Sequence, residues 1–211
     1  MTAEDEAGRN PLAPGENFPM PPEIAEWRNA DRKRLIEGRV AVSQDDRTAR
    51  TAKIVAGLDK VVEQVSGRVV SLYWPFRGEP DLRPWMETVT ARGGTTLLPL
   101  VVAKRHPLLF RAWKKGEPLE RGVWNIPIPA NGPERIPDIV IAPLVGFDPD
   151  CFRLGYGGGF FDRTLASLSK KPLIIGVGYE FQSMPSIKPQ RHDIPMDVII
   201  TDAGIVERKR P

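Results

Sequence analysis

The sequence predicts an α/β fold, a three-layer sandwich around a largely parallel, Rossmann-like central sheet. Short β-branched and aromatic segments alternate along the chain with segments of helical period, which is the pattern of strands and helices packed in layers. The chain has 211 residues, of which 41% are apolar, so it can bury one substantial core. We therefore expect a single domain over residues 21–211 that binds ligands beyond the carboxyl ends of its strands.

Two helices are expected to open this domain. Pro22 suits the first turn of a helix that runs to about Val40, because the N–H that proline lacks has no partner in a first turn. Ser43 followed three residues later by Asp46 resembles a capping box, which marks the start of a helix. This second helix is expected to continue through Leu58.

Six strands and two further helices complete the pattern. The strands are predicted at residues 69–74, 95–102, 108–113, 139–143, 173–178 and 197–201. One helix is expected to begin at Asp81 and to stop before Gly93 and Gly94, and another spans about residues 159–168. The Pro-rich residues 126–137 are expected to form a long loop, and long loops within compact domains are often functional.

Composition and charge narrow the class of protein. Residues 1–20 are expected to be a disordered leader, since Pro, Gly and charged residues leave little apolar surface there. No apolar run approaches the roughly 20 residues that cross a bilayer, and the single cysteine, Cys151, cannot form an internal disulfide, which favours the cytoplasm. The net charge of +3 comes from scattered basic residues, which argues against nucleic acid. We expect small-molecule partners, no membrane partner, and a monomer or weak dimer.

The most informative segment is a glycine-rich turn, GYGGG at residues 155–159, between a predicted buried strand and a predicted helix. Its glycines can adopt positive φ and approach a ligand closely, and the N–H groups of such a turn suit an anion such as phosphate. Arg153 adds a planar donor fork, and Asp162 can hold a divalent cation. Plain loop punctuation is an equally good interpretation of the glycines alone, because neither GxxxxGK[ST] nor a full GxGxxG occurs.

The longer string RLGYGGGFFDR, residues 153–163, resembles the signature of the 5-formyltetrahydrofolate cyclo-ligase (5,10-methenyltetrahydrofolate synthetase) family. Other family patterns occur at WPFRGE (74–79), WNIPIP (124–129) and HDIPMD (192–197), so the likeness extends over about residues 24–205. The resemblance implies ATP- and magnesium-dependent cyclisation of 5-formyltetrahydrofolate to 5,10-methenyltetrahydrofolate, with release of ADP and phosphate. ATP would phosphorylate the formyl oxygen, N10 would add to the activated carbon, and phosphate would depart.

The resemblance also implies roles for individual residues. Arg153 and Tyr156 are the expected catalytic residues, and Asp162 and Asp193 are the expected magnesium ligands. The expected ATP contacts are Arg28, Arg32, Arg153, Gly155, Tyr156, Gly157, Gly158, Gly159, Phe160, Phe161 and Asp162. The expected substrate contacts are Trp74, Glu79, Trp124, Tyr156, Gly157, Gly158, Gly159 and Phe160. A carboxylate suits the N–H groups of a pterin because it offers two acceptors and no donor.

Without the resemblance, several of these residues have plainer interpretations. Glu79 is more readily a solvated loop glutamate, and Trp124 is more readily a core residue. His192 invites a role as general base because histidine titrates near neutrality, but the implied reaction supplies its own nucleophile. His106 is expected on a surface loop, and Cys151 is expected to be structural because the sequence pairs no base with it.

The chain also departs from the family pattern. Arg28 stands where a lysine is usual, which keeps the charge but not the geometry. Phe160 and Phe161 replace two tyrosines and so lack two hydroxyls, and Ile128 replaces a Glu or Gln between two prolines. These departures leave an alternative open, a divergent paralogue that binds a nucleotide or folate without this turnover and acts as a regulatory or interaction protein.

Overall fold

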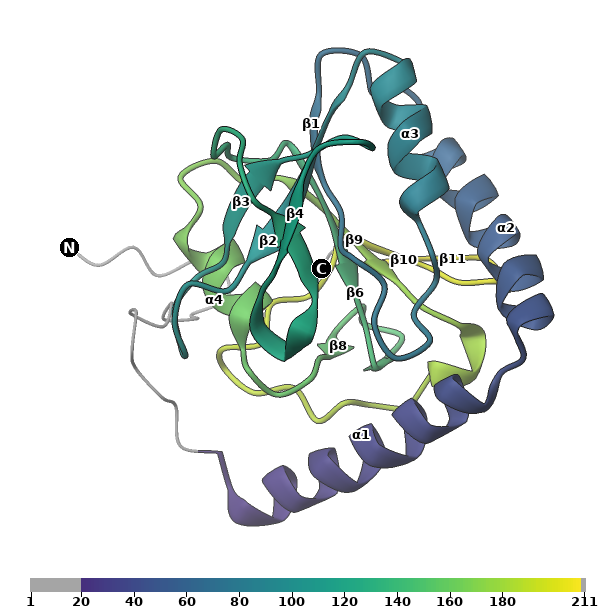
Figure 1. Ribbon diagram of the computed structural model, residues 1–211. Helices are drawn as coiled ribbons and strands as arrows, with labels where there is room; N and C mark the ends of the chain where they lie inside the picture. The colour runs from purple at the N-terminus through teal and green to yellow at the C-terminus, as the bar shows by residue number, and fades with distance from the viewer. Residues whose placement is uncertain (1–19, 210–211) are drawn as a thin grey trace.

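A seven-stranded sheet forms the centre of the part of the chain that the computed structural model describes, residues 20–209 (Figure 1). The expected leader lies outside the described residues except for Met20. The strands are β1 (Val69–Ser71), β2 (Thr95–Leu100), β3 (Leu109–Ala112), β6 (Ile139–Pro143), β9 (Leu173–Val177), β10 (Val198–Ile200) and β11 (Ile205–Glu207). Their order is β11-β10-β9-β6-β1-β2-β3, with the five inner strands parallel and both edge strands antiparallel.

The predicted strands all form, although most are shorter than expected. β6 matches the predicted residues 139–143 at both ends, because its apolar side chains are buried on both faces of a parallel sheet. β1 ends at Ser71 instead of Trp74, since the chain leaves the sheet ahead of Pro75, which has no N–H for a ladder. The edge strand β11 was not predicted, and its residues are mostly exposed.

Helices cover both faces of this sheet, which confirms the predicted three-layer α/β sandwich. The helices are α1 (Pro22–Ala41), α2 (Gln44–Val61), α3 (Arg83–Ala91) and α4 (Phe160–Ser167). α2 and α3 lie on one face, where Leu58 and Trp85 join a core with Ile141 (Figure 1). On the other face α4 packs Phe161 into a second cluster with Ile174. Among residues 20–209, none of the helices combines the length and apolar character that a membrane span requires.

The helix starts show which local signals in the sequence were decisive. The side chain of Ser43 caps α2 by accepting the Asp46 N–H at 3.1 Å, as predicted. The cap of α3 was predicted wrongly by one residue, because Leu82 occupies the N-cap position. Asp81 instead accepts the N–H of Arg83 at 3.1 Å, an Asx turn just ahead of the helix.

The predicted loop at residues 126–137 contains a strand that the sequence did not reveal. β5 (Pro127–Pro129) pairs antiparallel with β4 (Leu119–Arg121), and the two are joined through the single turn η1 (Val123–Asn125). Proline has no backbone N–H to donate to a neighbouring strand, and it interrupts the alternation of apolar and polar residues that marks a strand. A two-stranded hairpin of this composition is therefore predicted as a loop. A second small hairpin joins β7 (Gly146–Phe147) to β8 (Arg153–Leu154) ahead of the glycine-rich turn.

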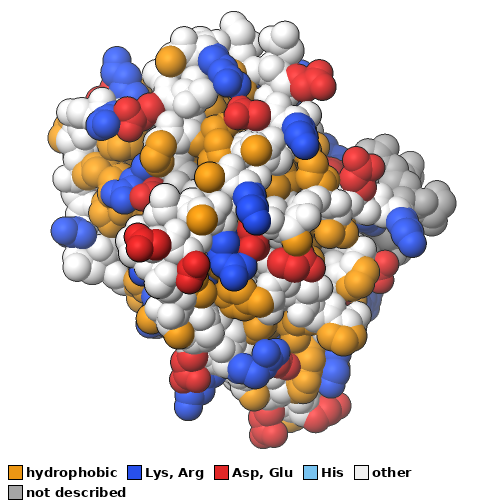
Figure 2. Space-filling view, turned by 90° about the vertical axis from the view of Figure 1, so that its right-hand side faces the viewer, with side chains coloured by type: hydrophobic (Ala, Val, Ile, Leu, Met, Phe, Trp, Pro, Cys, Tyr) orange, Lys and Arg blue, Asp and Glu red, His pale blue; other side chains and the backbone are white. Residues whose placement is uncertain are grey.

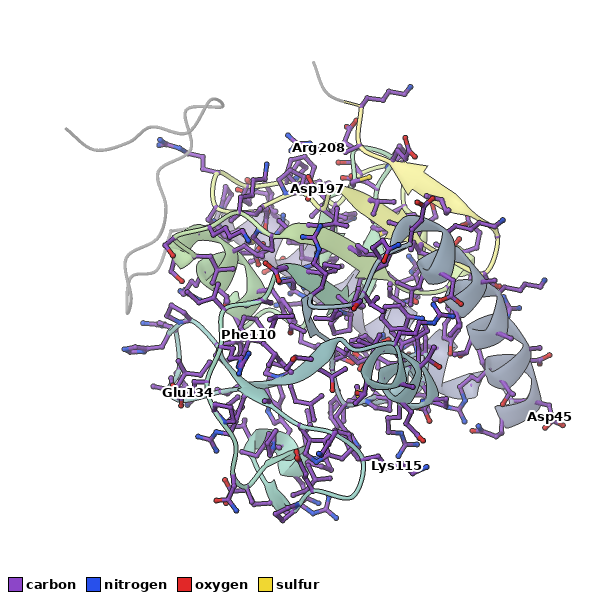
Figure 3. All side chains as sticks on the ribbon, turned by 90° about the horizontal axis from the view of Figure 1, so that it is seen from above. Asp45, Phe110, Lys115, Glu134, Asp197 and Arg208 are labelled. Carbon is purple, nitrogen blue, oxygen red and sulfur yellow. The ribbon has the colours of Figure 1, made fainter. Side chains whose placement is uncertain are left out.

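The two edges of the central sheet lie on opposite sides of the molecule (Figure 3). At the β11 edge, the Arg208 N–H donates to the Asp197 carbonyl at 3.1 Å. At the β3 edge, the bridge between Arg111 and Glu134 shows that the segment after β5 partly covers the strand. Figure 2 shows basic and acidic side chains interspersed on the side of the molecule that faces right in Figure 1.

The strand order places a topological switch point between β1 and β6. From β1 the chain moves outward to β2, whereas β6 returns to the other side of β1 and leads on to β9. The loops that follow β1 and β6 therefore diverge, which leaves a crevice at the carboxyl ends of these two strands. α1 packs along this end of the sheet, where Leu35 meets Val145 and Leu154.

Candidate active site

A pocket opens at this switch point, and every residue that the sequence predicted for the site lines it. These residues are Arg28, Arg32, Trp74, Glu79, Trp124, Arg153, Gly155, Tyr156, Gly157, Gly158, Gly159, Phe160, Phe161, Asp162 and Asp193. They come from α1, from the loop after β1, from η1, from β8, from the glycine-rich turn with the start of α4, and from the segment before β10. The fold thus brings together groups that are up to 165 residues apart in the sequence.

The glycine-rich turn forms one wall of the pocket and runs directly into α4. Gly157 (φ 92°) and Gly159 (φ 63°) adopt left-handed conformations, and Gly159 is the N-cap of the helix. A Cβ on Gly158 would lie 2.5 Å from the Phe160 ring, which leaves no room for a side chain. The turn therefore presents backbone N–H groups and a helix N-terminus toward the pocket, an arrangement that suits an anion.

Two ion pairs lie at the end of the pocket beside this turn. Arg28 grips Asp193 with both terminal nitrogens, at 2.5 Å (Nη2 to Oδ2) and 3.3 Å (Nη1 to Oδ1). Arg153 Nη2 donates to Asp162 Oδ2 at 3.2 Å. All four side chains are buried. Since buried charges need compensation, a ligand that binds either carboxylate competes with its arginine. We call this region the phosphate end.

Arg32 connects α1 to the glycine-rich turn. Its Nε donates to the Gly155 carbonyl at 2.8 Å, and its Nη1 donates to the Asn29 side chain at 2.6 Å. Burial lowers the pKa of Arg32, and the nearby charge of Arg28 lowers it further. A bound anion would relieve the repulsion between these two guanidinium groups.

Glu79 marks a second region of the pocket, which we call the ring end. Only 5% of the residue is exposed, so the interpretation as a solvated loop glutamate is wrong. Its Oε1 accepts the Tyr156 hydroxyl at 2.9 Å, and its Oε2 accepts the Phe76 N–H at 2.9 Å. Burial raises the pKa of Glu79 to about 7, against the opposing effects of Arg39 and of these two hydrogen bonds.

Aromatic side chains form a slot beside this carboxylate. The rings of Phe76 and Trp124 are nearly parallel, with centroids 6.4 Å apart and planes inclined by 10°. Tyr156 lies 5.9 Å from Phe76, and Phe160 meets Trp124 edge-on at 6.4 Å. Trp124 is 55% exposed, so its interpretation as a core residue is wrong. Flat walls next to a hydrogen-bonding carboxylate suit a planar heterocycle.

Arg39 on α1 is a residue of the site that the sequence reasoning missed. It is fully buried behind the pocket and donates to the hydroxyl of Tyr156. Burial and the negative charge of Glu79 raise the pKa of this tyrosine. Spacing could have revealed Arg39, because Arg28, Arg32 and Arg39 recur at helical intervals on one face.

The remaining candidates lie where the plainer interpretations placed them. Cys151 is buried with its thiol directed at the Val206 carbonyl, and burial raises its pKa to about 11, as befits a structural cysteine. His106 is exposed on the loop after β2. His192, beside Asp193, lines the pocket. Ile128 in β5 also lines it.

The acids at the phosphate end fit magnesium unequally. Within residues 20–209, no group of three or more His, Cys, Asp or Glu side chains is arranged to hold a metal. Magnesium commonly takes one or two carboxylates and completes its shell with water and phosphate oxygens. Asp162 fits such a role, because both of its contacts, with Arg153 and with the Ile194 N–H, are long at 3.2 Å. Asp193 fits less well while Arg28 and the Gln190 N–H hold it at 2.5 and 2.6 Å.

Fold and pocket together define an α/β enzyme of the class that acts on small ligands at the carboxyl edge of a parallel sheet, and its pocket holds a glycine-rich turn that suits an anion and an aromatic slot that suits a flat ring. Residues 24–202 match the 5-formyltetrahydrofolate cyclo-ligase family, so the chain belongs to that family. This match confirms the resemblance inferred from the signature at residues 153–163.

Individual relatives agree with this assignment. The 5-formyltetrahydrofolate cyclo-ligase of Mycolicibacterium smegmatis is 29% identical over 185 residues, which cover 83% of this chain and 94% of that protein. The enzyme of the same name from Escherichia coli K12 is 30% identical over 68% of this chain and 82% of its own length. The solved structure of Aquifex aeolicus 5,10-methenyltetrahydrofolate synthetase matches with a TM-score of 0.76 and 28% identity, covering 87% of this chain and 94% of that one.

Proposed function

We propose that this protein is a 5-formyltetrahydrofolate cyclo-ligase that uses ATP and magnesium to form 5,10-methenyltetrahydrofolate, with release of ADP and phosphate. The observation that carries the proposal is that the glycine-rich turn and the buried Glu79 carboxylate line one and the same pocket. A triphosphate at the turn and a pterin at Glu79 would then meet in the middle of the pocket. Family membership supports the same reaction.

The chemistry requires little covalent help from the protein. A formamide oxygen leaves poorly as hydroxide, so the formyl oxygen on N5 first attacks the γ-phosphorus of ATP, and ADP departs as the bridging P–O bond breaks. N10 then bonds to the activated formyl carbon and loses its proton, and phosphate leaves with the former formyl oxygen. Because the substrate supplies both nucleophiles, the protein contributes mainly positioning and charge neutralisation.

At the phosphate end, we assign ATP binding to the turn N–H groups and to three arginines, Arg28, Arg32 and Arg153. Arg153 is held with its guanidinium 4.8 Å from the Phe161 ring, so it is oriented before ligand binds. Asp162 is the residue best placed to hold magnesium, and Asp193 joins it once Arg28 turns to a phosphate. When bound, magnesium neutralises charge on the phosphate oxygens.

At the ring end, we assign the pterin to Glu79 and to the aromatic slot. The ionised carboxylate accepts N–H groups of the pterin, while Trp74, Trp124 and Phe160 flank its faces. Tyr156 lies between the two ends, since its hydroxyl binds Glu79 and its backbone belongs to the glycine-rich turn. We therefore propose that Tyr156 and Arg153 are the catalytic residues.

The test is the appearance of methenyltetrahydrofolate absorbance when purified protein meets 5-formyltetrahydrofolate and Mg-ATP. We expect product only when all three components are present, with one ADP formed for each product. Binding of ATP and folate without product would overturn the proposal in favour of the paralogue, which the departures at Arg28, Phe160, Phe161 and Ile128 motivate.

We also propose a cytoplasmic monomer or weak dimer that binds neither nucleic acid nor membrane, which its buried cysteine and scattered charges support.

A further inference from the structure

Arg39 is a buried cation whose contacts join three parts of the pocket. Its side chain is completely inaccessible to solvent. Nε donates to the Arg77 carbonyl at 2.9 Å, in the loop after β1, and Nη1 donates to the Leu144 carbonyl at 2.9 Å, just after β6. Nη2 donates to the hydroxyl of Tyr156 in the glycine-rich turn. One guanidinium therefore links both strands of the switch point to the turn.

Arg39 forms an ion pair with Glu79 but no hydrogen bond to it. The nearest carboxylate is Glu79, whose Oε1 lies 3.7 Å from Nη2, beyond hydrogen-bond distance. The Tyr156 hydroxyl stands between them, because it accepts from Arg39 and donates to Glu79 Oε1 at 2.9 Å. A buried ion pair is costly to desolvate, and here the tyrosine hydroxyl supplies the hydrogen bonds that the two charged groups do not make to each other.

The loop that carries Glu79 is also packed tightly onto the end of α1. Gly78 has a φ of 77°, and a Cβ at this position would lie 2.9 Å from the Arg39 carbonyl oxygen. The position of Glu79 relative to α1 is thus fixed both by the backbone and by the guanidinium.

We propose that Arg39 is a positioning residue that acts through the Tyr156 hydroxyl to fix the Glu79 carboxylate, and so couples the ring end of the pocket to the glycine-rich turn. The catalytic consequence rests on the proposed function, whereas the coupling itself is a property of the unliganded protein. Arg39 touches neither ligand, and its effect on turnover is transmitted by the two residues that do.

The charge state of Glu79 makes this coupling measurable. Three titratable groups face its carboxylate: Arg39 from α1, Tyr156 from the turn, and Tyr73 from the segment after β1, whose own pKa Glu79 helps to raise. Of these, only Arg39 is a cation, and it lowers the pKa of Glu79 against the effect of burial. Removing the cation must therefore move the titration of Glu79 to higher pH.

The experiment is a carbon-detected NMR titration of the Glu79 carboxyl in ligand-free protein, assigned with E79Q. We expect a midpoint near 7 in the wild type and an upward shift of about one pH unit or more in R39Q. R34Q is the matched control, because Arg34 lies on the same helix with a side chain 64% exposed. Its midpoint should equal that of the wild type, and an unchanged midpoint in folded R39Q overturns the inference.

Two further variants keep the test decisive. R39K retains the charge, so its midpoint should return toward the wild-type value. If R39Q fails to fold, the same titration is made with Y156F. Loss of the shared hydroxyl should also raise the midpoint of Glu79. An unchanged midpoint in Y156F overturns the relay through Tyr156.

Kinetics extend the test to the enzyme. In R39Q the KM for 5-formyltetrahydrofolate at pH 7.5 should rise about threefold, while the KM for ATP changes less than twofold, since moving the midpoint from about 7 to about 8 lowers the ionised fraction of Glu79 at this pH about threefold. An equal rise in both values would indicate a merely structural role and overturn the inference. If the wild type forms no methenyl product, the proposed function fails, yet the NMR titration still decides the role of Arg39.

Discussion

At the phosphate end of the pocket each carboxylate is bound directly by an arginine, whereas at the ring end Glu79 is joined to Arg39 through a tyrosine hydroxyl. Direct pairs can exchange partners when a phosphate offers an arginine a new anion and a metal offers the acid a new cation. The relay at the ring end has no such alternative, because Arg39 does not line the pocket. We therefore expect the side chains of the phosphate end to change partners when ligands bind, and those of the ring end to keep the contacts they have in the unliganded protein.

This contrast predicts that substitutions at the two ends will have separable kinetic effects. Changes at the phosphate end should lower turnover, since that end is engaged most strongly in the transition state of phosphoryl transfer. Changes at the ring end should instead weaken the binding of the folate, which is held in the same way before and during the reaction.

The largest effect is expected from D162A. The substitution removes the proposed magnesium ligand and leaves Arg153 without its carboxylate partner. We expect kcat to fall roughly 100-fold or more, measured by the methenyl absorbance assay. D150A is the control, because Asp150 is exposed in the segment before β8. Near-normal turnover in D162A would remove the metal assignment and with it the contrast between the ends.

The next largest effect is expected from E79A at the ring end. Loss of a buried charged acceptor should lower kcat/KM for 5-formyltetrahydrofolate by roughly 10- to 100-fold, while the dissociation constant for Mg-ATP stays within twofold. Steady-state kinetics and calorimetry measure the two quantities, with E63A at an exposed position as control. Equal losses for both ligands would mean that the ends do not act separately.

A smaller effect is expected from W124A. Because Trp124 is mostly exposed, its removal should leave the melting temperature nearly unchanged. The KM for the folate should rise about three- to tenfold through loss of one wall of the slot. L119A, in β4 of the same hairpin, serves as the control. An unchanged KM would exclude Trp124 from the ring end.

The smallest effect is expected in stability, because the titration of Glu79 makes the free energy of unfolding depend on pH. Its pKa is higher in the folded protein than the ordinary value of 4.5, so the folded state binds more protons than the unfolded state between that pH and about 7. Its contribution to the free energy of unfolding should therefore decrease as pH rises through this window, by about 1.4 kcal/mol per unit of pKa difference. Urea unfolding from pH 5 to 8 should show a shallower decrease in E79Q than in the wild type, and equal slopes would contradict the raised pKa.

Local patterns in the sequence were sufficient for most of the fold, whereas pocket residues such as Glu79 and Trp124 were predicted only through the family resemblance. β6, α4 and the glycine-rich turn each carry a complete signal within a dozen residues, in burial, period or glycine content. The β4–β5 hairpin was missed because prolines conceal its alternation. The pairing of Arg28 with Asp193 and the relay from Arg39 were out of reach, since both depend on contacts between residues far apart in the chain.

Three of the four arginines of α1 constrain when the pocket can assemble during synthesis. Their partners lie late in the chain: the contacts of Arg28 span 165 residues, those of Arg32 span 123, and that of Arg39 with Leu144 spans 105. This helix therefore carries side chains whose binding partners are translated more than 100 residues later. A nascent chain cannot assemble the pocket before the segment ahead of β10 has emerged, because Asp193 in that segment is the partner of Arg28.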